Sequence, residues 1–494
     1  GVTGVMADMV TEGAGDLDAN AFKERLEELN VTLSFGAGWD GVGMSLVTLS
    51  ANREAAFAMA RSALSAPRFD AAPLERIRSQ LLVGIRTRET NPGFIANRAL
   101  DRALYSGHPY ARRTSRESVA AIIRAALAER RAALMTRERL QITIVGDIDA
   151  TEARRLIDAT FGGLPGTGVA PEPADASVAP ATPLIVHQLP QPQSLVLFAA
   201  PGIQDEDPDW IPLAVANYIL GGGGFSSRLM DEVREQRGLV YGVSTSPSVR
   251  EHVALIRGSA QTENGDAAEA IGVIRDVMGR LYREGATQGE VNDAITYLTG
   301  SFALDLDSNS NIASVVHGYQ TAGRDIDYIN RRNALIRAVT LADVNRVIRR
   351  LLNPDAFTFV VVGDTEKERA AQAQTVKQQI AFYGSTPAYR PVLEAHGWGS
   401  LQEDLHALTK QGRWGEMGEL VTDEMLDTYA VTATYETLTS MAAGARQWGS
   451  ASSFRGSRLA RKIRRGARVS ATMPGCRRPR ARRCRRSSGA CRRR

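Results

Sequence analysis

The stretch ILGGGGFSSRLMDEVREQRGLVYGVSTS, residues 219–246, changes its structural signal several times. An apolar helical pattern over residues 211–220 leads into four consecutive glycines, Gly221–Gly224. A second helical pattern ends at Gly238, because glycine readily takes the left-handed conformation that stops a helix. Residues 239–249, LVYGVSTSPSV, then have the composition of a strand. The stretch therefore predicts two helices joined by a glycine run and followed by a strand.

Outside this stretch, the chain contains an internal duplication. RLQITIVGDIDATEARRLI (139–157) and AFTFVVVGDTEKERAAQA (356–373) share a β-rich run, then Val-Gly-Asp, then a helix that opens with Thr-Glu. A helix-like segment precedes each copy, at residues 118–134 and 340–352. Because the copies are about 217 residues apart, the repeat is a duplicated domain and not a solenoid unit.

Each half alternates helix and strand signals. Residues 31–50 alternate with period two like a β-hairpin, and residues 193–203 predict a strand. One helical face in the first half carries Leu74, Ile77, Leu81 and Ile85. We therefore predict an α+β fold with helices packed on a mainly antiparallel sheet in each half.

The composition sets the domain boundaries. Residues 163–184 are rich in Pro, Ala and Gly and predict a linker between two tandem homologous domains, 1–162 and 185–364. Residues 451–494 hold 17 Lys and Arg and no acid, so the net charge of +5 comes from this tail. The preceding 450 residues hold 43 basic and 55 acidic residues and have no electrostatic reason to bind nucleic acid. No run is long and apolar enough to span a membrane.

The opening stretch resembles a known family in its order of motifs: the glycine run, Ser-Arg-Leu, the Val-Arg-Glu helix end and the following tyrosine. Its setting within duplicated α+β halves adds to the resemblance. The family is that of the insulinase/pitrilysin-type zinc peptidases, in the branch of the mitochondrial processing peptidase and its bacterial relatives. The resemblance covers roughly residues 1–364. In this family, one helix carries His-x-x-Glu-His, whose two histidines bind zinc and whose glutamate activates water.

This chain has GVMAD at the matching helix positions. Gly4 and Asp8 stand where the histidines would be, and Ala7 stands where the general base would be. The third ligand position, a glutamate in the family, matches Gly84, and its acidic companion matches Ile77. Glycine and alanine donate no lone pair, so the resemblance implies that this chain binds no zinc here. A glycine within a helix costs about 1 kcal/mol, so we also expect close packing at Gly84 or mere tolerance of the residue there.

No other residues of the body replace these ligands in the sequence pattern. The six histidines (His108, His187, His252, His317, His396 and His406) are not paired at helical ligand spacing. The three cysteines (Cys476, Cys484 and Cys491) all lie in the basic tail, which excludes a thiolate site in the body.

The family resemblance gives a role to the second half. Branch members often pair a zinc-bearing subunit with one that lacks zinc ligands and supplies an Arg/Tyr pair to the shared chamber. The matching residues are Arg234, which could hold a substrate carbonyl, and Tyr241, which could donate to the oxyanion. On spacing alone, a solvated helix-end arginine and a strand tyrosine remain the simpler interpretation.

Gly221, Gly222, Gly223 and Gly224 match a glycine-rich loop linked to substrate recognition in the family's non-catalytic subunit. We expect a loop open to the backbone of an extended peptide. The alternative is a flexible turn with Ser226 or Ser227 capping the next helix. Phosphate binding is not indicated, because no Gly-Lys-Ser/Thr follows.

After Asp364 a different pattern begins. Residues 376–431 resemble the C-terminal helices of luciferase-like, deazaflavin-dependent oxidoreductases, although no barrel precedes them. We therefore predict a helical fragment over 365–436, in which His396, Trp398 and Trp414 are packing residues. The Arg-rich tail, 437–494, is expected to be disordered. It is either a tail for anionic partners or the product of GC-rich DNA read out of frame, which would make the chain a composite.

The resulting hypothesis is a catalytically inactive subunit that pairs with a zinc-bearing homologue and assists peptide binding and proteolysis. A scaffolding homologue and an active peptidase remain the alternatives. No cofactor is expected in this chain, and zinc is expected only in the partner. By resemblance we expect a periplasmic or exported location and a first domain truncated at its start, where the chain begins at Gly1.

Overall fold

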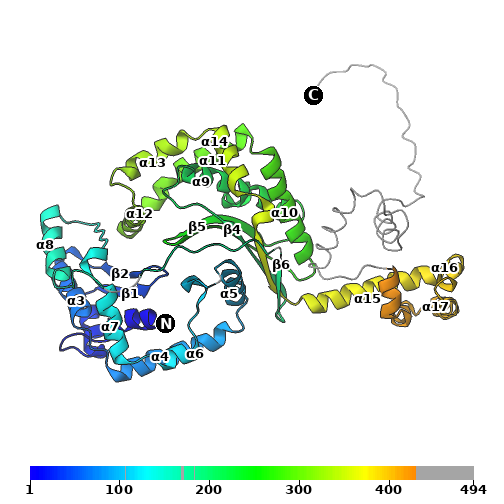
Figure 1. Ribbon diagram of the computed structural model, residues 1–494, viewed down its shortest axis with the longest axis horizontal. Helices are drawn as coiled ribbons and strands as arrows, with labels where there is room; N and C mark the ends of the chain where they lie inside the picture. Colours follow the sequence, from blue (N-terminus) through cyan, green and yellow to red (C-terminus); the bar gives the residue numbers. More distant parts are fainter. Residues whose placement is uncertain (106, 169–171, 183, 430–494) are drawn as a thin grey trace, which may run out of the picture. The chain divides into compact units, whose positions relative to one another are not determined.

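The computed structural model describes residues 1–105, 107–168, 172–182 and 184–429. The chain divides into two compact units, Gly1–Ala370 and Ala371–Arg494. The predicted tail, residues 437–494, lies outside the described residues. The α+β fold class is confirmed, since the first unit combines helices with a mainly antiparallel sheet (Figure 1).

The first half of unit Gly1–Ala370 consists of helices around one β-hairpin. Its elements are α1 (Val2–Met9), α2 (Ala19–Glu28), β1 (Thr32–Ala37), β2 (Val42–Val47), α3 (Arg53–Ser65), α4 (Ala71–Arg88), α5 (Pro92–Leu104), α6 (Arg116–Ala120), α7 (Arg124–Leu134) and α8 (Ala150–Phe161), with short 3₁₀ turns η1 (Ser50–Asn52), η2 (Pro109–Ala111) and η3 (Arg137–Arg139). The hairpin predicted over residues 31–50 is confirmed, with Phe35 opposite Met44. The single helix expected over 118–134 is instead two, α6 and α7.

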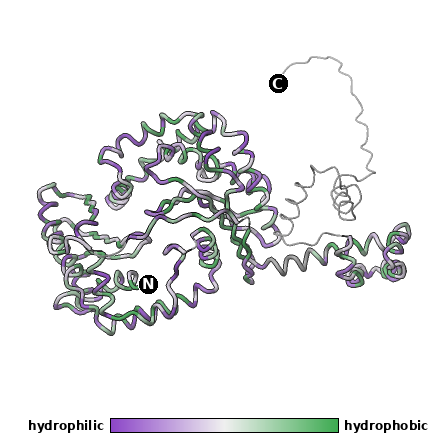
Figure 2. Tube along the Cα trace, viewed as in Figure 1, coloured by the Kyte–Doolittle hydropathy of each residue, from purple (hydrophilic) through white to green (hydrophobic). Residues whose placement is uncertain are grey.

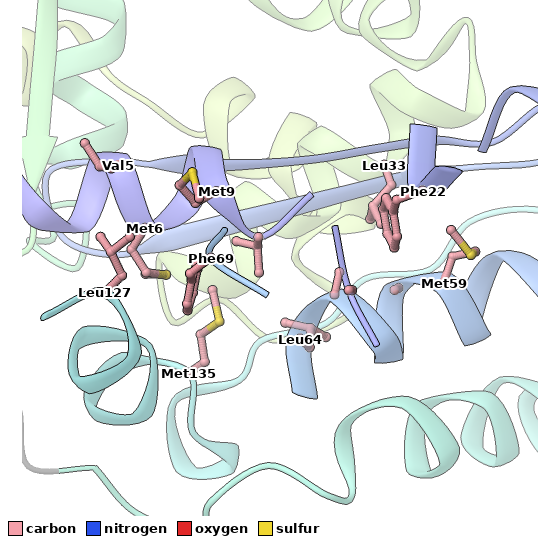
Figure 3. Packing of buried hydrophobic residues seen from close by; sticks show 14 of the residues in the cluster. Val5, Met6, Met9, Phe22, Leu33, Met59, Leu64, Phe69, Leu127 and Met135 are labelled. Carbon is pink, nitrogen blue, oxygen red and sulfur yellow. The ribbon is translucent and has the colours of Figure 1, made fainter. Parts of the chain in front are cut away.

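Apolar side chains fix helix α1 in the core of this half. Val5, Met6 and Met9 are buried and pack with Leu127 of α7 and with Phe69 (Figure 3). Asp8, on another face of the helix, is exposed. The buried face therefore sets the rotation of α1 and turns position 8 away from the core.

The strand predicted over residues 139–146 is wrong. Residues 140–146 pair with no described strand. Helix α8 begins directly after its capping residue, Asp149. Leu140 and Ile142 pack on the helical core, and Thr143 Oγ1 donates to Gln320 Oε1 at 3.0 Å. A β-rich sequence forms a strand only beside a backbone partner, and β1 and β2 pair with each other.

The second half places helices over a five-stranded sheet. Its elements are β3 (Ile185–Gln188), β4 (Gln193–Pro201), α9 (Trp210–Asn217), η4 (Tyr218–Gly222), η5 (Gly224–Ser226), η6 (Met230–Glu235), β5 (Gly242–Arg250), β6 (Val253–Glu263), α10 (Ala267–Glu284), α11 (Gln288–Gly300), η7 (Ser301–Leu306), α12 (Asn309–Thr321), α13 (Tyr328–Arg337), α14 (Leu341–Leu351), η8 (Pro354–Ala356) and β7 (Thr358–Gly363). η4 and η6 are π-helical turns. The strands predicted at 193–203 and 239–249 correspond to β4 and β5.

The strand order of the sheet is β3-β7-β4-β6-β5, and only β3 and β7 run parallel. β7, the second copy of the repeat, is buried along its whole length and is hydrophobic in Figure 2. Helix α5 packs on one face of β4 and β7, where Leu100 joins Leu197 and Val360 in a core cluster. Helix α10 packs on β4 and β6 as well (Figure 1). The boundaries of the two homologous domains remain predictions.

Unit Ala371–Arg494 is helical where the structure describes it. Helix α15 (Thr365–Gly384) leads to η9 (Pro387–Tyr389), α16 (Arg390–Glu394), α17 (Leu401–Lys410), η10 (Trp414–Leu420) and α18 (Asp423–Tyr429). Leu405 and Met417 lie in its small core. The His396 and Trp398 rings stack at 5.2 Å between centroids, and Trp414 remains half exposed. None of the described helices is long and apolar enough to cross a membrane.

Candidate functional site

A cleft lies where the family resemblance places the zinc site. Helix α1, strand β1 and helix α4 form its walls, and it encloses about 460 Å³. Ala7 and Asp8 from α1 and Ile77 and Gly84 from α4 all line it. Gly4 is one helical turn before Asp8, on the same side of α1. The structure therefore brings together residues that the sequence separates widely.

Glycine leaves open space at two of these positions. A Cβ atom built on Gly4 or on Gly84 would meet no other heavy atom within 4 Å. The close packing considered for Gly84 is therefore wrong, because this glycine faces the cleft and touches no neighbour at that side. Both positions have room for a side chain.

The residues of the cleft do not fit a zinc ion. Its lining contains no histidine, and Ala7 offers a methyl group where a general base would act. Partial desolvation raises the pKa of the Asp8 carboxyl group, and so does the charge of the nearby Glu12. Zinc sites in proteins usually combine carboxylates with histidine or cysteine ligands, and the lining offers neither. These residues therefore do not supply the ligand set that a metal-assisted step would need.

Charged side chains that the sequence analysis missed also line the cleft. Glu12, from the segment after α1, forms an ion pair with Arg76 of α4. Arg88, the last residue of the same helix, also lines the cleft. Arg76, Gln80, Gly84 and Arg88 follow one another at spacing four, which places them on one face of α4. That spacing was visible in the sequence and could have identified this polar stripe.

Arg234 lies in the π-helical turn η6, and its side chain is partly exposed. Its guanidinium carbon lies 4.8 Å from the centre of the Phe225 ring, and its Nε is 3.8 Å from Glu235 Oε1. Gly238, with φ of +67°, ends this turn by donating its N–H to the carbonyl of Arg234. The sequence-based assignment of Gly238 as a helix stop is confirmed.

Tyr241 immediately precedes strand β5. Its backbone N–H donates to the carbonyl of Gln261 on β6, while its side chain is 58% exposed. Backbone pairing thus fixes the residue at the sheet edge and leaves the phenol facing solvent. The hydroxyl group is accessible to another molecule.

The glycine run is mostly packed and not an open loop. A Cβ on Gly221 would lie 2.6 Å from Thr245 Oγ1, and a Cβ on Gly223 would lie 2.8 Å from the carbonyl oxygen of Tyr218. Gly224, with φ of +55°, has free space around it. The expectation of an open loop over all four glycines is therefore wrong, because η4 must approach β5 closely. Ser227 caps the next helical turn by accepting from Met230 N–H.

The Ser-Arg-Leu motif has a structural role. Arg228 donates through Nε and Nη2 to both carboxylate oxygens of Glu290, at 2.6 and 2.8 Å. Burial alone would raise the pKa of Glu290, but these bonds and those from Thr287 outweigh it and lower the pKa to about 2. The pair ties the segment after the glycine run to helix α11.

A cleft where the resemblance places a zinc site, lined by no histidine or cysteine, is the arrangement expected of an inactive metallopeptidase homologue. A family model described as "Peptidase M16 inactive domain" matches residues 121–298. The chain is 23% identical over 372 residues to "Non-peptidase homolog YmxG" of Helicobacter pylori, covering 75% of this chain and 86% of that protein. The solved "peptidase M16 inactive domain" of Pseudomonas fluorescens shares 30% identity at a TM-score of 0.68, covering 74% of this chain and 88% of that one. The chain belongs to peptidase family M16, the insulinase/pitrilysin-type family, as an inactive member.

A further relative matches a shorter stretch. The uncharacterized protein Rv1360 of Mycobacterium tuberculosis is 52% identical over 80 residues, which are 16% of this chain and 24% of that protein. The chain thus spans about a quarter of that relative. The resemblance of residues 365–436 to oxidoreductases remains a prediction.

Proposed function

We propose that this chain is the non-catalytic subunit of a two-subunit M16 peptidase. It pairs with a zinc-bearing homologue and helps to hold extended peptides for cleavage by that partner. The catalytic zinc belongs to the partner in this proposal.

One observation carries the proposal: a cleft of about 460 Å³ lies where the resemblance places the zinc site, and it presents Ala7, Asp8 and Gly84 in place of the family's base and ligands. A cleft without this chemistry favours a binding role over a catalytic one. Water activation at neutral pH needs a metal or a strong base, and neither chemistry is available from these three side chains.

The exposed hydroxyl group of Tyr241 supports assistance to a partner's site. A phenol donates a hydrogen bond to a developing oxyanion without a change in its own charge. Arg234 is on the segment that leads into the same strand and carries a permanent positive charge suited to carbonyl oxygens.

The test is peptide cleavage by the zinc-bearing homologue, mixed with this chain or with its variants. We expect Tyr241→Phe and Arg234→Ala each to lower the rate of the mixture at least tenfold, since one lost oxyanion donor commonly costs more than that. Tyr297→Phe and Arg237→Ala are matched controls, because Tyr297 is similarly exposed and Arg237 is near Arg234 but bonds to Glu232. Full activity of the mixture with both test variants would contradict the assisting role.

A scaffolding role is the second candidate, and the surroundings of Arg234 favour it. The guanidinium group already lies over Phe225 and beside Glu235. If these contacts are its whole purpose, then Arg234→Ala lowers the stability of this chain and leaves the partner's rate unchanged.

The family resemblance also supports an exported or periplasmic location. Fractionation of cells that produce the full-length gene product, followed by detection of this chain, tests it. Detection in the cytoplasmic fraction alone would contradict it.

A further inference from the structure

The linker predicted over residues 163–184 is attached to the turn between β5 and β6. The N–H of Ala176 donates to the carbonyl of His252 at 2.9 Å, and His108 Nε2 lies 3.0 Å from the carbonyl oxygen of Ala174. His252 Nδ1 is 3.2 Å from Asp175 Oδ1. Two histidines from distant parts of the chain thus hold one short segment of the linker.

Three side chains at this junction can bring ligand atoms together. Glu172 of the linker and Glu251 and His252 of the β5–β6 turn have ligand atoms within 4.8 Å of one another. His252 is buried, with 8% of its surface exposed, while both glutamates are exposed. This group is not apparent in the sequence, because its histidine has no partner at helical ligand spacing and Glu172 is 79 residues before Glu251.

We propose that Glu172, Glu251 and His252 form a binding site for a divalent transition-metal ion such as Zn²⁺. The site is separate from the α1 cleft, shares no residue with it and is not needed for catalysis by a partner. Its role is to fasten the linker to the β5–β6 turn.

The ligand chemistry suits such an ion. One imidazole and two carboxylates are a common donor set for zinc, and their two negative charges balance the ion. Ligand atoms at about 2.1 Å from a tetrahedral zinc lie about 3.5 Å from one another. The distances between the three ligand atoms, now up to 4.8 Å, therefore need to shorten by about 1 Å. The glutamates are exposed and flexible enough to do so by rotation about their side-chain bonds.

The surroundings of His252 also suit a metal ligand. A metal-binding histidine usually has a carboxylate beside its ring, which fixes the orientation and the tautomer. Asp175 occupies that position at Nδ1 of His252. The imidazole is therefore held in place before any ion arrives, and the exposed carboxylates leave the site open to solvent.

The experiment is a titration of the chelator-treated full chain with Zn²⁺, in which isothermal titration calorimetry measures the binding. Because Cys476, Cys484 and Cys491 could bind zinc independently, all proteins carry Cys→Ser substitutions at these three positions. We expect one equivalent of zinc, and a loss of at least tenfold in affinity for Glu172→Gln and for Glu251→Gln. Both substitutions are on the surface and leave the core intact. His187→Ala, which removes a histidine outside the site, serves as the control and is expected to bind zinc as the parent does.

Limited proteolysis provides a second readout, because a metal-bound linker is cleaved more slowly. We expect zinc to protect residues 172–182 in the parent and not in Glu172→Gln. The absence of zinc binding, or binding that neither glutamate substitution weakens, would overturn the proposal. Loss of binding in Asp8→Asn but not in Glu172→Gln would place the ion in the α1 cleft and contradict the proposed function as well.

Discussion

Ala7 of helix α1 and Gly84 of helix α4 line the same cleft, and the family resemblance matches them to the general base and the third zinc ligand. Neither side chain can bind a metal ion or accept a proton. If the match is right, the cleft has the framework of a zinc site without its ligands, and restoring the ligands tests this.

Zinc binding is expected to return when the ligands are restored. In the triple variant Gly4→His, Asp8→His and Gly84→Glu, we expect one additional zinc ion per chain. The two glycine positions have free space for new side chains, and positions 4 and 8 share a helix face. Metal analysis of the purified variant against the parent measures the gain.

The single variant Gly84→Glu is the matched control and should bind no additional zinc, since it adds a carboxylate to the cleft but no histidine. The triple variant should still cleave no peptide, because Ala7 remains in place of the base. If the triple variant binds no more zinc than the parent, the assignment of these positions is wrong.

The Arg228–Glu290 pair is expected to stabilise the second half above pH 4.5. The pKa of Glu290 falls from 4.5 to about 2 on folding, so the deprotonated group favours the folded chain. The contribution is present above the unfolded pKa and is lost as pH falls through the range 4.5 to 2. Such a shift corresponds to about 3 kcal/mol at most.

Urea unfolding of Glu290→Gln should therefore give a lower free energy of unfolding at pH 7, by about 2–3 kcal/mol, and a smaller difference from the parent at pH 3. Glu284→Gln, an exposed glutamate in the preceding helix, should change stability by less than about 0.5 kcal/mol. A difference for Glu290→Gln that stays constant between pH 7 and pH 3 would show that the pair does not act through this charge.

Alanine substitutions within the glycine run are expected to lower the free energy of unfolding by different amounts. Gly221→Ala should destabilise by about 2–3 kcal/mol, because the new Cβ would lie 2.6 Å from Thr245 Oγ1. Gly224→Ala should cost only about 1 kcal/mol, since its positive φ is strained but the space is free. Thermal unfolding measures both, and equal effects would mean that the run is an open loop after all.

Local patterns predicted much of the fold. The period-two alternation of residues 31–50 gave the hairpin β1–β2, and the apolar runs gave β4, β5 and β7. These elements were predictable because their own residues determine them: hydrophobic patterning decides which backbone is buried. Gly238 was predictable as a helix stop for the same local reason.

Other features depend on partners that a single sequence does not reveal. Residues 139–146 have the composition of a strand but no described strand lies beside them, while the repeat copy β7 pairs on both sides. The packing of Gly221 against Thr245, and the meeting of Glu172 with His252, join segments far apart in the chain. The family resemblance identified the cleft positions, and only the structure placed Arg76 and Glu12 beside them.

Peptide cleavage by the purified chain with added zinc, alone and mixed with a zinc-bearing homologue, tests whether the chain is an inactive subunit that assists a partner. We expect no cleavage by this chain alone and a rate for the mixture that exceeds that of the homologue alone. Cleavage by this chain alone, abolished by a chelator and restored by zinc, would contradict it.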